Sequence, residues 1–138
     1  MPPMSQTTDV PVTQQIEPDQ WTQFLSKFTR DYRGAHGRLE VIGGETGYAV
    51  ETENRPFDGA SADIKDGERS VWIVFGTTPA DHLTHGIHGA TVIRVVSPGG
   101  VRGPVLEVDA KDGSMTVLEL SRPQDYALPP FTPQDRQS

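Results

Sequence analysis

Three of the four histidines fall in one short segment, in the pattern His82-x-x-His85-x-x-His88, with Asp81 directly before the first. Imidazole and carboxylate are ligands for zinc, iron and nickel, so Asp81, His82 and His85 form a candidate metal site. Three-residue spacing brings imidazoles together only on a helix, because neighbouring strand positions point to opposite faces. The alternative is structural, with the histidines bonding loop carbonyls or facing solvent. A divalent transition metal is the only cofactor this pattern could require, and otherwise we expect none.

Four acidic residues could also do chemistry: Asp58, Asp63, Asp66 and Glu68. Paired carboxylates act as acid and base when burial separates their pKa values, or they hold a hard cation. The spacing matches no calcium loop, and a solvated hairpin edge explains the same charges.

Motifs for phosphate binding and hydrolysis are not supported. The glycine-rich stretch 43–47 precedes a predicted strand, so it is typical of a turn and not of a phosphate loop before a helix. There is no Gly-x-Ser-x-Gly elbow for a hydrolase triad. The lack of a complete catalytic motif favours a noncatalytic protein, and a metal-dependent enzyme is the alternative.

Arg55 and Phe57 form a candidate partner-binding pair, because aromatic residues and arginine dominate the energetics of interfaces. The alternative for Phe57 is a plug that closes the end of a barrel. Both residues lie in the stretch 54–59, whose composition predicts a loop.

The strongest strand signal is residues 71–75, Val-Trp-Ile-Val-Phe, and it directly precedes the histidine segment. Five consecutive apolar residues predict a strand that is covered on both faces, at the centre of a sheet. The histidine segment would then lie at the end of the central strand.

An amphipathic helix is predicted before the strands. Pro18 and Asp19 suit a first helical turn, and Gly34 suits its end. Between them, apolar residues recur at spacings of three and four and make one stripe: Trp21, Phe24, Leu25, Phe28 and Tyr32. The stripe requires an apolar partner surface.

Short strands with alternating or apolar character follow the helix. We predict them at 38–42, 47–52, 60–65, 91–96, 105–109 and 115–120, beside the strand at 71–75. Short turns between them, of which Asp66-Gly67 is the strongest hairpin signal, favour antiparallel neighbours. The predicted fold class is α+β: one N-terminal amphipathic helix followed by a six- or seven-stranded antiparallel meander, forming a curved sheet or partly open barrel.

The length of 138 residues suits one domain. We predict a flexible N-terminal lead over 1–15, a single α+β domain over 16–120 and a Pro-rich C-terminal tail over 121–138. Tyr126, Leu128 and Phe131 could dock part of that tail on the domain; otherwise we expect it to be disordered.

The charge narrows the choice of partners. A formal net charge of −7 repels phosphates, so we expect no nucleic acid, and no apolar stretch is long enough to cross a membrane. The sequence contains no cysteine, which fits a cytoplasmic protein.

Three motifs resemble those of a family of small uncharacterised bacterial proteins, a domain of unknown function. They are Trp21-x-x-Phe24, Pro56-Phe57-x-Gly59-x-x-x-Asp63 and Asp81-His82-Leu83-Thr84-His85-x-Ile87. The resemblance covers roughly residues 16–120 and leaves His88 outside the pattern. It implies a free-standing cytoplasmic domain and carries over no activity, cofactor or catalytic residue.

The sequence therefore predicts a noncatalytic binding or interaction module with a protein or small-molecule partner. Many short edge strands favour a homodimer. The alternative is a metal-binding protein or metal-dependent enzyme that uses Asp81, His82 and His85.

Overall fold

A computed structural model of the chain describes residues 12–45, 47–97 and 103–121. Within these ranges, two short 3-10 helices, η1 (Pro18–Gln20) and η2 (Pro79–Asp81), accompany one α-helix, α2 (Trp21–Tyr32). The described residues also form eight antiparallel strands in one sheet, in the order β1-β6-β7-β8-β2-β3-β4-β5, and this sheet does not close into a barrel. The strands are β1 (Val12–Ile16), β2 (His36–Gly43), β3 (Gly47–Lys65), β4 (Glu68–Phe75), β5 (Leu83–His88), β6 (Ala90–Ser97), β7 (Val105–Ala110) and β8 (Met115–Leu120).

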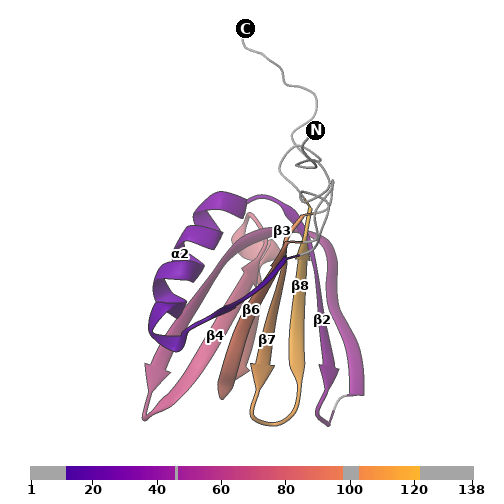
Figure 1. The fold of residues 1–138 in the computed structure, drawn as a ribbon. Helices are drawn as coiled ribbons and strands as arrows, with labels where there is room; N and C mark the ends of the chain where they lie inside the picture. Colours follow the sequence, from indigo (N-terminus) through magenta and orange to yellow (C-terminus); the bar gives the residue numbers. More distant parts are fainter. Residues whose placement is uncertain (1–11, 46, 98–102, 122–138) are drawn as a thin grey trace, which may run out of the picture.

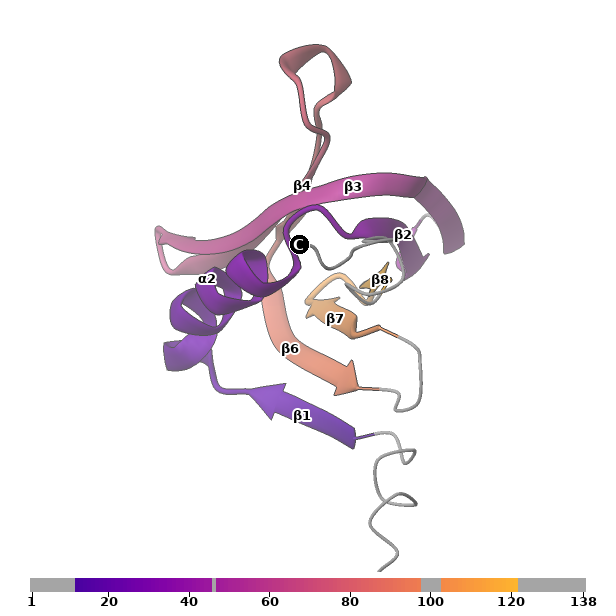
Figure 2. The ribbon, with the colours of Figure 1, turned by 90° about the horizontal axis from the view of Figure 1, so that it is seen from above.

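The sheet curls because β3 belongs to two halves of it. The first part of this 19-residue strand pairs with β2 and the second part pairs with β4. Between the two parts, Asn54 has a positive φ of 54° and Pro56 has no amide hydrogen to donate, so regular pairing is interrupted there. Figure 2 shows the curl from β1 through β6, β7 and β8 to β2 and β3, with α2 between β1 and β3.

The predicted amphipathic helix is confirmed. Trp21, Leu25 and Phe28 are buried, and α2 packs against β3 (Figure 1). The Trp21 indole Nε1 donates a hydrogen bond of 3.0 Å to the Ile16 carbonyl, which ties β1 to the start of the helix. The stripe therefore finds its apolar partner on the concave face of the curled sheet.

Inward-pointing residues of both sheet halves make one core with the helix. On β4 these are Val71, Ile73 and Phe75, and on β8 they include Leu118 and Leu120. The alternation follows from the strand period of two, which sends successive side chains to opposite faces.

The strand count and strand order differ from the sequence prediction. The structure has eight strands instead of six or seven, and the meander is broken because β8 pairs with β2 and β1 pairs with β6. The sequence predicts a flexible lead at residues 12–15, but these residues form most of β1. Their composition is polar, and the strand is held by its backbone pairing with β6. Residues 54–59, predicted as a loop, lie inside β3.

The stretch 71–75 is not the central strand. β4 lies next to the edge strand β5, and its outward residues Trp72 and Val74 are only half-buried. Trp72 is apolar although it points outward, because its indole packs over the backbone of Gly86 on β5. A Cβ at Gly86 would come within 2.5 Å of the Trp72 ring, so the ring uses space that only glycine leaves.

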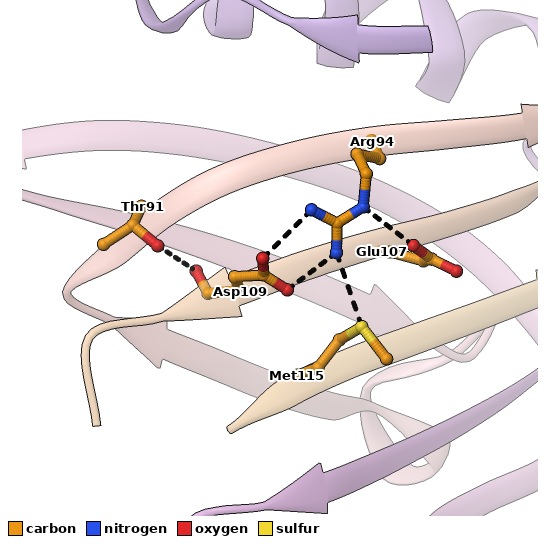
Figure 3. A network of polar contacts seen from close by, with 5 residues as sticks. All are labelled: Thr91, Arg94, Glu107, Asp109 and Met115. Carbon is orange, nitrogen blue, oxygen red and sulfur yellow. Dashed lines mark hydrogen bonds and ion pairs between the residues drawn. The ribbon is translucent and has the colours of Figure 1, made fainter. Parts of the chain in front are cut away.

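A network of ion pairs lies on the outer face of the sheet. Figure 3 shows Arg94 on β6 bonded to Glu107 at 2.9 Å and to Asp109 at 2.8 Å, both on β7. These carboxylates raise the pKa of Arg94, so its charge is fixed. Ion pairs of this kind tie neighbouring strands together on the face opposite the core.

The expectations for the tail residues Tyr126, Leu128 and Phe131, and for residues 1–11 of the lead, lie outside the described ranges. Within those ranges, no helix is long and apolar enough to cross a membrane.

Candidate functional site

The first half of the histidine segment joins what we call the bend cluster: Arg55 and Asp58 on β3, with Asp81 and His82 at η2. Arg55 Nη1 donates to Asp81 at 2.8 Å to the carboxylate and 3.0 Å to the carbonyl. His82 Nε2 lies 3.7 Å from an oxygen of Asp58. The polar groups of the cluster are therefore engaged with one another.

Gly76 is what brings η2 back onto β3. Its φ is +108°, and a Cβ there would collide with the Asp81 carbonyl oxygen, so only glycine fits this turn. Its amide donates a 2.8 Å hydrogen bond to the carbonyl of Pro56. The chain folds sharply after β4 and places Asp81 beside Arg55.

The predicted metal ligands are separated in the structure. Asp81 bonds Arg55 and His82 faces Asp58, whereas His85 lies on β5 opposite the core residue Ile73. No group of three or more His, Cys, Asp or Glu residues within the described ranges is placed to hold a metal ion. The metal site remains a prediction that the geometry does not support.

The two predicted partner-binding residues, Arg55 and Phe57, lie where β3 passes from its pairing with β2 to its pairing with β4. Phe57 is only 1% exposed and packs edge-on against Phe28 and Phe75 in the core, which corrects the expectation of a surface anchor. Arg55 is half-buried, and its Nε donates to the hydroxyl of Thr52 at 2.9 Å. Its interactions connect β3 to η2.

A pocket of about 400 Å³ lies at the other end of β5. We call it the turn-end pocket, because the β2–β3 turn, the β7–β8 turn and the last residues of β5 meet there. The inner faces of β2, β5, β7 and β8 supply its deeper wall. It is lined by Val41, Gly43, Gly44, Glu45, His85, Gly86, Ile87, His88, Ala110, Asp112, Ser114 and Thr116.

Thr116 is the most unusual residue of this wall. It is 2% exposed and lies on the inner face of β8, in register with Val41 and Val108. Four polar or charged residues are buried in the described part of the chain. Three of them, Glu40, Thr52 and Ser70, have side-chain hydrogen bonds, whereas Thr116 has none to a described residue. The Thr116 hydroxyl is not among the fully buried side-chain atoms that lack a partner, of which Arg69 Nε is the one in the described ranges, so the hydroxyl oxygen reaches the pocket and can be hydrogen-bonded there by solvent or a ligand.

His85 lines the same pocket and also makes no hydrogen bond to a described residue. Its imidazole is half-buried on the inner face of β5. Burial lowers the pKa of His85, and the Glu51 charge offsets this only in part. At neutral pH the ring is therefore uncharged, with one nitrogen that donates and one that accepts.

The rim of the pocket is built by two turns in contact. A Cβ at Gly43 would lie 2.9 Å from the Gly113 carbonyl oxygen, so the turns approach as closely as backbone allows. Asp112 accepts hydrogen bonds from the amide and hydroxyl of Ser114, at 2.9 and 2.7 Å, and these bonds lower the pKa of Asp112. The rim thus carries a fixed carboxylate charge.

His88 borders the pocket, but its ring is engaged on the outer face. Its Nδ1 is hydrogen-bonded to Ser70 Oγ at 3.3 Å, and its ring contacts the Trp72 indole edge-on. Of the pocket's two histidines, His85 is the one whose ring has no hydrogen bond to a described residue.

Sequence reasoning identified His85 for a different chemistry and missed Thr116. The signal was present: in β8, Thr116 shares its face with Leu118 and Leu120, so a polar residue occupies an inward position of a core strand. The pocket itself could not be found from the sequence, since it depends on two turns that are far apart in the chain.

The Thr116 hydroxyl and the His85 imidazole line the same pocket and are not hydrogen-bonded to each other. An uncharged imidazole and a hydroxyl instead offer hydrogen bonds to a polar guest.

Comparison with known proteins gives a family but no activity. No curated protein matches the chain, and no solved structure matches it. A model of a family of unknown function, DUF5335, matches residues 12–129, which is well over half of the chain. The match includes every strand of the sheet and the whole of the turn-end pocket. The chain therefore belongs to the DUF5335 family, whose function is unknown.

Proposed function

We propose that this protein is a noncatalytic binding module that takes a small polar molecule into the turn-end pocket. The observation that carries the proposal is the pairing of Thr116 and His85, two polar side chains without hydrogen-bond partners among the described residues, in one pocket wall. A hydrogen bond contributes about 0.5–1.5 kcal/mol net. A ligand that bonds both groups therefore gains free energy from each of them.

The position of the pocket supports the same proposal. Ligand sites are commonly concave, mostly apolar and provided with a few convergent polar groups. Ile87 and Ala110 are buried core residues and supply the apolar part, whereas Thr116 and His85 supply the polar groups.

The test is a ligand screen of the full 138-residue chain by amide NMR spectra, with a library of small polar compounds. Binding in the pocket is expected to shift the amide signals of Gly43, Gly44, His85 and Thr116 together. A screen in which no compound moves these signals, or in which all hits act elsewhere, would overturn the proposal.

Variants make the screen specific. Thr116→Val and His85→Leu are expected to weaken any pocket ligand at least about tenfold, because each removes a hydrogen bond from a desolvated group. The matched control is His82→Leu, which removes an imidazole of the same segment from the bend cluster. Equal loss in the control would show that the effect is not local to the pocket.

We also propose self-association through β5, with a second copy of the chain as the occupant. β5 is an edge strand of the described sheet, and its residues carry no formal charge when its two histidines are neutral, so antiparallel pairing of two copies brings no like charges together. Sedimentation at high concentration should show a dimer that Thr84→Lys on β5 disrupts and Thr13→Lys on β1 leaves intact. A strict monomer would remove this proposal. A cytoplasmic location, favoured by the cysteine-free sequence, remains a prediction.

A further inference from the structure

We infer that the ligand of the turn-end pocket is a small organic amine: an ammonium group on a short apolar body. This inference rests on the proposed binding function and adds the chemical class of the ligand. It is carried by the charges around the pocket, its apolar walls and the two hydrogen-bonding groups of its inner wall.

The charges near the pocket are negative. Glu45 and Asp112 line it, and the Glu51 carboxylate acts on His85 from β3. No lysine or arginine is among its lining residues. The nearest basic residue along the chain, Lys111, directs its ammonium group to Glu68 at 2.8 Å, where it is paired outside this pocket. A cation that enters is attracted by two rim carboxylates, and an anion is repelled by both.

The inner wall can accept hydrogen bonds from an ammonium group. The uncharged His85 ring offers one nitrogen lone pair, and the Thr116 hydroxyl oxygen offers two. An alkylammonium ion is charged at neutral pH, like a lysine side chain, and needs acceptors only. The apolar residues Val41, Ile87 and Ala110 line the same pocket and suit a short hydrocarbon chain.

The test uses three probes of equal length that differ at one end: n-butylamine, 1-butanol and butyrate. Each is titrated into the full chain at pH 7.5 and low salt, and binding is followed by the amide signals of His85 and Thr116. The expected order of affinity is amine, then alcohol, with no binding of the carboxylate. Added salt should weaken the amine and leave the alcohol unchanged, because only the amine is held by charge.

Two charge-removing variants locate the attraction. Glu45→Gln and Asp112→Asn are each expected to weaken n-butylamine about fivefold at low salt and to leave 1-butanol unchanged. The Asp112→Asn variant keeps a side-chain oxygen that can accept hydrogen bonds from Ser114, so the turn should persist. The control is Asp63→Asn, which removes a carboxylate that does not line this pocket, and no change is expected for it.

The outcomes separate this inference from the proposed function. Pocket binding by 1-butanol or butyrate at least as strong as that of n-butylamine would overturn the amine class while supporting the pocket as a ligand site. Binding of n-butylamine that survives both charge-removing variants would also overturn it. Absence of n-butylamine binding overturns the amine class as well, and the wider compound screen then decides the proposed function alone.

Discussion

The two ends of the histidine segment carry similar residue types, but they differ in whether these side chains have partners within the described residues. In the bend cluster, carboxylates, an arginine and an imidazole face one another: Arg55 bonds Asp81, and His82 lies beside Asp58. In the turn-end pocket, His85 and Thr116 lie on inner faces of the sheet and make no hydrogen bond to a described residue. In the bend cluster Arg55 and Asp81 are engaged with each other, whereas His85 and Thr116 are open to a ligand in the pocket.

This difference shows why residue type alone is a poor guide to function. The bend cluster contains most of the residues that the sequence singles out, yet their partners are within the chain. The pocket depends on a threonine that no chemical motif identifies. What distinguishes this threonine is its position on the inner face of the sheet, where its hydroxyl opens into the pocket and has no hydrogen bond to a described residue.

The largest effect is expected from removing the aromatic side chain at the bend. Phe57→Ala should lower the free energy of unfolding by about 3–5 kcal/mol, because it opens a cavity between Phe28 and Phe75. Urea unfolding measures this loss. The control Ile64→Ala, at a side chain that is 65% exposed, should change stability by less than about 0.5 kcal/mol. A small effect of Phe57→Ala would contradict the structural role of this side chain in the core.

A smaller effect is expected for the ion pair of the bend cluster. Asp81→Ala should cost at most about 1 kcal/mol, because Arg55 and Asp81 are both partly exposed to solvent. The loss should shrink in high salt, and ligand binding in the turn-end pocket should not change. Loss of pocket binding in this variant would show that the two regions are coupled.

The prediction for pH concerns His85. Its pKa is lowered in the folded state, so the unfolded chain binds the proton more strongly and acid favours unfolding. The stability contribution is complete above the ordinary histidine pKa of about 6.5 and is lost as the pH falls through the lower folded value. Urea midpoints between pH 8 and 5 should fall less in His85→Gln than in the parent chain. His82→Gln is the matched control, and an equal reduction there would refute the assignment to His85.

Features of the fold that depend on neighbouring residues in the sequence could be predicted, and features that depend on distant residues could not. The helix stripe from Trp21 to Phe28 and the Asp66-Gly67 hairpin follow from local spacing, and the structure has both. β1 could not be predicted, because Thr13, Gln14 and Gln15 carry no apolar pattern and are ordered only by pairing with β6.

The candidate site was harder to predict than the fold. The histidine spacing suggested convergence, but a turn at Gly76 turns His82 toward β3 while His85 continues along β5. Thr116 becomes informative only when its burial and its lack of a hydrogen-bond partner are both known. These properties belong to the assembled sheet and not to any stretch of sequence.

No effect on stability is expected from metals. Because Asp81, His82 and His85 do not converge, zinc, nickel, iron(II) and manganese should leave the melting temperature of the chelator-treated chain unchanged. A metal-specific rise that disappears in a His82→Ala/His85→Ala double variant would restore the metal-site prediction and displace the binding proposal for His85.

The most direct test compares Thr116→Val with Thr52→Val by urea unfolding of the ligand-free protein. Both threonines are buried, but within the described ranges only the Thr52 side chain has a hydrogen-bond partner, accepting from Arg55 at 2.9 Å. Thr52→Val should lower the free energy of unfolding by about 1–2 kcal/mol, whereas Thr116→Val should leave it unchanged or raise it. If Thr116→Val is destabilising to the same degree as Thr52→Val, the Thr116 hydroxyl serves the fold, and the central claim that it awaits a ligand is wrong.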